Sequence, residues 1–292
     1  MQIAYHIGVH CTDEDKLLRS VFKNKGFLIP QGIIAPRVKL YRRQLREAIE
    51  ALKGARVGPD VRRMLLQKIL GDQPEPKRLI LSNPNFIAGI PGVFQNGKLY
   101  PRLEHQVQSF INIFAHDELE IFIGIRNPAT FIPAVMKHMP DKDIQTVLSG
   151  FNPQSLRWSN LCARITEIAP QADLTVWCNE DTPLIWSRII RAYADMEPDA
   201  TVEGAFDLLP EIMSHEGLDA FYAQLEQEKP ANDADLLDLK IKYLERHAMD
   251  GAMEEELDVP GWSAAYVEKL TQLYDMDVAR IAGMPGIRFI QP

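Results

Sequence analysis

Cysteine is scarce in this chain: three residues among 292, at Cys11, Cys162 and Cys178. They are far apart, odd in number and free of any CxxC spacing, so the sequence indicates neither a disulfide framework nor a zinc cluster. Long hydrophobic runs are also missing, because no stretch approaches the roughly 18 uninterrupted apolar residues that a membrane-spanning helix requires. No basic leader precedes the first apolar segment, and we therefore expect a cytoplasmic protein.

Several familiar catalytic signatures are absent as well. The sequence contains no GxSxG, HExxH, GxGxxG or intact GxxxxGK[ST], which are typical of hydrolase triads, zinc peptidases, dehydrogenases and P-loop NTPases. The composition is otherwise ordinary, with 46% hydrophobic and 25% charged residues, 17 glycines and 20 prolines. Disorder and fibrous structure are therefore excluded.

Charge is distributed unevenly along the chain, whose net charge is −8. Residues 1–102 carry 18 lysines and arginines against 8 acidic residues, and the remainder carries 14 against 32. The acidic remainder argues against nucleic acid as a partner. The basic stretch over 37–78 either attracts an anionic ligand or is a solvated helix face balanced by acidic neighbours. The acidic run 254–256 is interpreted as solvated surface.

The alternation of short apolar strands and helices predicts an α/β fold, with a mostly parallel sheet flanked by helices. Strands are expected at 2–10, 78–82, 119–125 and 174–178. Helices are expected from about 17 and at about 40–53, 60–70, 102–114, 130–138 and 156–168, with a loop over 26–36. Beyond residue 202 we expect helices only, at 234–247 and 263–274, the first capped by Asn232 and Asp235. This predicts one domain over 1–292, with a sheet core in 1–200 and a helical extension in 201–292.

Ligands of an open parallel sheet bind beyond the carboxyl ends of the strands, so the segment after the first strand is examined first. It reads His6-Ile7-Gly8-Val9-His10-Cys11-Thr12-Asp13-Glu14-Asp15-Lys16-Leu17-Leu18. It resembles the opening of the bacterial branch of the sulfotransferase family, His-Ile-Gly-x-x-Lys-Thr-Gly-Thr-Thr-x-Leu. The segments 32–36, 81–83, 122–126 and 279–292 are similar to later family segments in the same order.

This resemblance implies a nucleotide-kinase type of P-loop fold and 3′-phosphoadenosine 5′-phosphosulfate as the cofactor. It places Gly8 and Thr12 beside the 5′-phosphosulfate and Arg126 beside the 3′-phosphate. Lys16, one position beyond the acidic run 13–15, is added to the cofactor-binding residues because it can offset part of the acidic charge. The serine that the family has eight positions after the arginine is Ala134 here. Arg126 can instead pair with an acidic residue of the pair 180–181 at a neighbouring strand end.

The loop departs from the family pattern in a way that changes its charge. Cys11 stands at the lysine position, and Asp13, Glu14 and Asp15 replace Gly-Thr-Thr. Like charges 4 Å apart repel by about 4 kcal/mol near a protein surface, which opposes an anionic donor. The same residues also fit a capping box, with Thr12 as the N-cap and Asp15 at N3. A metal held by Asp13 and Asp15 is a further alternative, although no other ligand cluster accompanies it, and we predict no metal site.

Two other sets of residues complete the candidate site. His10 is a candidate general base toward an acceptor hydroxyl, or a simply hydrogen-bonded histidine, whereas His6 is expected in the core. A basic helix face is expected to meet an anionic small-molecule or glycan acceptor. Its members are Lys39, Arg42, Arg43 and Arg46.

The residues support two functions from different classes. The first is sulfuryl transfer from the nucleotide donor to an acceptor hydroxyl, carried out mainly by positioning and charge stabilisation. The alternative is a non-catalytic binding protein of sulfotransferase fold that has lost the donor site. A membrane-surface protein using residues 37–78 is a third class. The sequence leaves the acceptor and the oligomeric state open.

Overall fold

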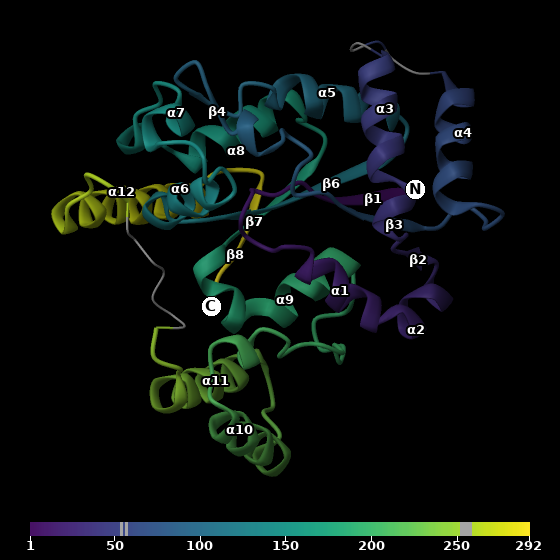
Figure 1. The fold of residues 1–292 in the computed structure, drawn as a ribbon. Coiled ribbons are helices and arrows are strands. Elements are labelled where there is room, and N and C mark those ends of the chain that lie inside the picture. Colours follow the sequence, from purple (N-terminus) through teal and green to yellow (C-terminus); the bar gives the residue numbers. More distant parts are fainter. Residues whose placement is uncertain (53–54, 56–57, 252–258) are drawn as a thin grey trace.

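Six parallel strands form the central sheet of the structure, a computed structural model that describes residues 1–52, 55, 58–251 and 259–292 (Figure 1). Every neighbouring pair in this sheet is parallel. The predicted mostly parallel α/β fold is therefore confirmed. The spatial order is β2 (Ile33–Ile34), β3 (Arg78–Ser82), β1 (Gln2–His6), β6 (Glu118–Ile125), β7 (Asp173–Cys178) and β8 (Ile287–Ile290).

The sheet has a core on each face, because side chains alternate along its strands. In β1, Ile3 and Tyr5 join the larger hydrophobic cluster, whereas Ala4 joins the second one. The helices that cover the larger cluster are α3 (Arg42–Leu52), α4 (Pro59–Leu70), α5 (Leu103–Ile113), α6 (Pro128–Lys137), α7 (Ile144–Leu148), α8 (Trp158–Ile168) and α12 (Ala264–Ala282). A small antiparallel hairpin, β4 (Phe94–Gln95) and β5 (Lys98–Leu99), lies beside them.

The opposite face is covered by α1 (Lys16–Lys23), α2 (Lys25–Leu28) and α9 (Thr182–Ala194). Two further helices, α10 (His215–Glu228) and α11 (Asp233–His247), pack together against α9 in a third small cluster away from the sheet (Figure 1). Asn232 caps α11 by accepting from the amides of Ala234 and Asp235, as predicted.

Three expectations about the elements are wrong. The segment 26–36 is not only a loop, because it contains most of α2 and the edge strand β2. The extension over 201–292 is not purely helical, because β8 returns to the sheet and pairs with β7, Leu174 opposite Ile287. The first strand is also shorter than expected and ends at His6. The run 254–256 lies outside the described residues.

None of the helices in the described ranges is both long enough and apolar enough to cross a bilayer.

Candidate functional site

The candidate site begins with residues 7–15, called the first loop here, which connect β1 to α1. The loop is anchored to β6, because the Val9 amide donates to the Gly124 carbonyl at 2.9 Å and the Gly124 amide donates to Gly8 at 2.8 Å. Gly8 has φ +122°, and a Cβ there would lie 3.2 Å from the Pro84 carbonyl oxygen. The backbone path itself therefore requires glycine at this position.

Three residues of the first loop adopt left-handed backbone conformations without being glycine. Cys11, Glu14 and Asp15 have φ of 58°, 51° and 66°. Such conformations cost roughly 1–2 kcal/mol per non-glycine residue.

The capping-box prediction is wrong. Helix α1 begins at Lys16, and the residue at its N-cap, Asp15, forms no side-chain capping hydrogen bond. Thr12 instead donates its hydroxyl to the Val9 carbonyl at 2.7 Å. Neither Thr12 nor Asp15 therefore plays the capping role that the pattern predicted.

Asp13 occupies the interior of the first loop. Its side chain is only 5% exposed and lies 3.3 Å from Nδ1 of His6, which is fully buried as expected. Burial raises the pKa of the Asp13 carboxyl, and the charge on His6 and the amides of Leu17 and Lys16 oppose that rise. Within the described residues, neither carboxylate oxygen forms a hydrogen bond of good geometry. A buried carboxylate thus stands at the start of α1, where a bound anion would otherwise meet the helix amides.

The other charged residues of this region face different partners. Asp15 forms a two-pronged ion pair with the guanidinium of Arg42, one of whose contacts is 3.1 Å. Arg42 also donates to the Ser82 carbonyl at 2.8 Å, so it links the first loop to β3. Lys16 donates to Glu211 at 2.6 Å, on a turn beside the helical pair α10–α11.

Arg126, at the end of β6, contacts the first loop directly. Its Nη1 donates to the Cys11 carbonyl, and its Nε donates to the Thr130 hydroxyl at 3.1 Å. Of the acidic residues considered as its partner, Glu180 accepts from the Asn127 amide at 2.7 Å and from the Tyr274 hydroxyl at 2.9 Å. Arg126, which was expected to bind the 3′-phosphate of the donor, therefore also holds the backbone of the first loop.

His10 is held on both sides of its ring. Nε2 lies 2.9 Å from the Ala88 carbonyl, which only accepts, so Nε2 carries the proton and Nδ1 accepts from the Tyr100 hydroxyl at 2.8 Å. Burial lowers the pKa of His10 from 6.5 to about 4. The hydrogen-bonded alternative fits this arrangement, because neither nitrogen is open to a substrate.

The basic helix face lines a cavity of about 450 Å³, called the basic groove here. Among the described residues, the groove has five cationic side chains and a single carboxylate, Glu50. The cations are Lys39, Arg42, Arg43, Arg46 and Arg102. Arg43 also pairs with Glu47 at 2.7 Å, an exposed contact that contributes little.

Sequence reasoning missed the polar residues of the same groove. Asn83 and Asn85 follow β3 directly, a position that could have identified them, and Gln106 comes from α5. Tyr5 also lines the groove, although it is only 1% exposed, and its hydroxyl has no hydrogen-bond partner among the described residues. Nothing in the sequence distinguishes Tyr5 from a core tyrosine.

The predicted site residues therefore separate into two groups. Gly8, Thr12 and Arg126 meet in the first loop, and the four basic residues meet in the groove, with Arg42 joining the two. Lys16 lies outside both. Across the ranges that the structure describes, no group of three or more histidine, cysteine or acidic side chains is arranged to hold a metal ion.

Comparisons with known proteins return one structural similarity. No family model and no curated protein matches the sequence. The structure is similar to that of a sulfotransferase from Alicyclobacillus acidocaldarius, with 12% identity and a TM-score of 0.42 over 83% of this chain and 96% of that one.

Proposed function

We propose that this chain is a binding protein for an anionic, hydroxyl-bearing small molecule, such as a sugar phosphate or sugar sulfate, which is held in the basic groove. We further propose that it does not use 3′-phosphoadenosine 5′-phosphosulfate. One observation carries the proposal: the Asp13 side chain is buried inside the first loop, and a groove lined by cationic side chains lies next to that loop. The chain thus corresponds to the non-catalytic alternative of the sequence resemblance.

The first loop does not fit the phosphosulfate group that the resemblance implies. The buried Asp13 carboxylate stands at the amides that would bind the group, whereas the Asp15 carboxylate is paired with Arg42. In its ionised form, Asp13 would repel a unit negative charge 4 Å away by about 4 kcal/mol, which lowers affinity roughly a thousandfold. His10 offers no base in compensation, because both of its nitrogens are engaged.

The basic groove fits a polar anion much better. Within the described ranges, the side chains of Lys39, Arg46 and Arg102 form no hydrogen bond or ion pair, so they are available to a phosphate or sulfate. The amides of Asn83 and Asn85 can donate to and accept from sugar hydroxyls. The groove lies beyond the carboxyl ends of β1 and β3, where parallel sheets place their ligands.

Loss of the donor site is tested by calorimetry with 3′-phosphoadenosine 5′-phosphate. We expect no binding to the wild-type chain, and binding to a variant carrying Cys11→Lys, Asp13→Gly, Glu14→Thr and Asp15→Thr. Glu14→Thr alone is the matched control. Because it leaves Asp13 in place, this variant should not bind the nucleotide. Micromolar binding by the wild-type chain would overturn this half of the proposal and favour a working transferase.

Ligand binding in the groove is tested with glucose 6-phosphate and glucose 6-sulfate against glucose. We expect millimolar or tighter binding of the two anions only, weakening as salt rises. Combined Lys39→Gln, Arg46→Gln and Arg102→Gln should reduce affinity at least tenfold, whereas exposed Lys269→Gln on α12 should not. Equal binding of glucose and its anions, or no effect of the triple variant, contradicts the groove as the site.

A further inference from the structure

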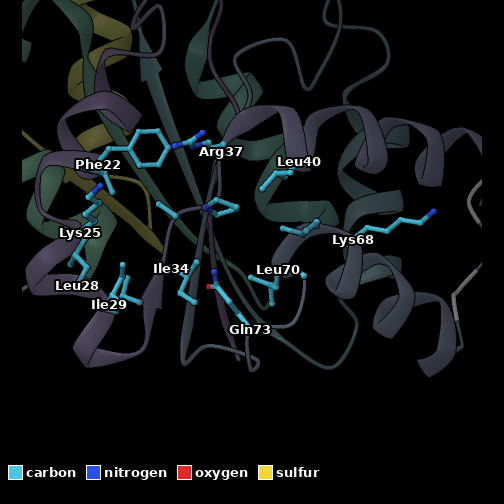
Figure 2. Close-up of a pocket in the computed structure, with 16 residues that line it drawn as sticks. Phe22, Lys25, Leu28, Ile29, Ile34, Arg37, Leu40, Lys68, Leu70 and Gln73 are labelled. Atoms are coloured by element: carbon cyan, nitrogen blue, oxygen red, sulfur yellow. The ribbon is translucent and has the colours of Figure 1, made fainter.

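A second cavity lies at the β2 edge of the sheet, on the other side of residues 37–40 from the basic groove. Its volume is about 590 Å³, within the range of small-molecule sites. Its wall is mainly aliphatic and comes from α1, α2, β2 and the end of α4 (Figure 2). The members with large apolar side chains are Val21, Phe22, Leu28, Ile29, Ile33, Ile34, Leu40, Ile69 and Leu70. We call this space the apolar cavity.

Apolar surface at the mouth of this cavity is exposed to water. Ile29 and Leu40 line it and are 58% and 37% exposed, and nearby Phe27 is 51% exposed. Ile29 and Leu40 thus leave apolar surface of the cavity wall exposed, as a binding surface does.

The charge at the apolar cavity has one sign. Lys25, Arg37 and Lys68 are among its lining residues, and none of the described residues that line it is acidic. In Figure 2, Lys25 and Arg37 lie on the same side as Phe22, whereas Lys68 extends away at the opposite rim. An aliphatic interior with two cations at one end matches a molecule with an apolar tail and an anionic head.

We propose that the apolar cavity binds a single-chain aliphatic anion, of which a medium-chain fatty acid is the simplest example. The tail packs among Leu28, Ile33 and Leu70, and the head group lies beside Lys25 and Arg37. This site is separate from the basic groove, and its ligand is of a different chemical class. The proposal does not depend on the proposed function.

The ligand class predicts a dependence on chain length. Each methylene buried from water should tighten binding about fourfold, until the tail fills the cavity. The series hexanoate, octanoate and decanoate should therefore rise steeply in affinity below their micelle concentrations. Acetate, which has the head group alone, should bind undetectably.

Calorimetry on the whole chain tests the site with decanoate and decanol as probes. Lys25→Gln with Arg37→Gln should weaken decanoate at least tenfold and leave decanol unchanged. Ala35→Leu places a larger side chain in the cavity and should weaken both ligands. Lys269→Gln, far away on α12, is the matched control and should change neither.

The thermal unfolding transition of each variant is measured, and binding results are used only for variants that are folded. The proposal is overturned if affinity does not increase with chain length, or if neither the charge variant nor Ala35→Leu changes decanoate binding. Binding to anionic phospholipid vesicles without binding to monomeric decanoate also overturns it. That result would identify a membrane surface in place of a ligand cavity.

Discussion

At the scale of single residues, polar side chains at the end of β1 are mostly committed to the protein itself. His10 binds Tyr100 and Ala88, and Asp13 lies buried beside His6. Both ring nitrogens of His10 are hydrogen-bonded within the protein, and its role as a general base stays a prediction. The unpartnered hydroxyl of Tyr5, in contrast, lines a cavity.

The buried state of His10 predicts a dependence of stability on pH. Because burial lowers its pKa from 6.5 to about 4, the unfolded chain binds the proton first on acidification. The stabilisation is complete above pH 6.5 and is lost as the pH falls toward 4, by up to about 3 kcal/mol. Urea denaturation should therefore show that His10→Gln loses less stability between pH 7 and pH 4.5 than the wild type.

The matched control is His105→Gln, at an exposed position on α5. It should lose stability in parallel with the wild type over the same pH interval. A wild type and a His10→Gln variant with the same pH dependence would show that His10 remains accessible to protons in the native state.

The hydroxyl of Tyr5 makes a prediction about the groove. Tyr5→Phe removes one buried donor and changes almost no volume, so the fold should be retained. If glucose 6-phosphate reaches the floor of the groove, its affinity should fall about fivefold in calorimetry. An unchanged affinity would place the ligand nearer the rim formed by Lys39 and Arg46.

At the scale of elements, the sheet is held at its amino-terminal edge by a partly buried ion pair. Arg78 of β3 is 2% exposed and binds Glu120 of β6 through both terminal nitrogens, with one contact at 2.8 Å. It also donates to the Tyr193 carbonyl of α9 at 3.1 Å. One side chain thus connects two strands and a helix.

Removing this arginine should be costly. Arg78→Met leaves the Glu120 charge without its partner, and we expect a loss of about 3–5 kcal/mol in the free energy of unfolding. The double variant Arg78→Met with Glu120→Met should recover part of that loss. Arg63→Met is the control, because its pair with Asp60 is exposed and should contribute under 1 kcal/mol.

The elements also show where sequence reasoning succeeds and where it does not. The strand 78–82 was predicted with its observed bounds because its apolar run is buried on both sides and ends at Asn-Pro. Strand β8 was missed because Arg288 interrupts a four-residue edge strand, whose pairing with β7 spans more than a hundred residues. The capping box failed for a different reason, since tertiary burial of Asp13 outweighed a local pattern.

At the scale of the whole molecule, the basic first third of the chain lies beside two cavities. The basic groove and the apolar cavity both use residues of the basic first third. Contacts such as those of His10 with Tyr100, 90 residues away, could not be inferred from local patterns. The basic segment could be predicted from composition, but the presence of two cavities of different chemistry could not.

The turn over residues 38–40 separates these two cavities. Val38 and Lys39 face the basic groove, whereas Arg37 and Leu40 face the apolar cavity. A ligand that shifts this shared wall changes the affinity of the other compartment, and thermodynamic reciprocity requires the same factor in both directions. With about fivefold coupling, saturating glucose 6-phosphate would alter the dissociation constant of decanoate as much as decanoate alters that of the sugar phosphate. A partition three residues long would then be the element through which the two proposed sites are coupled.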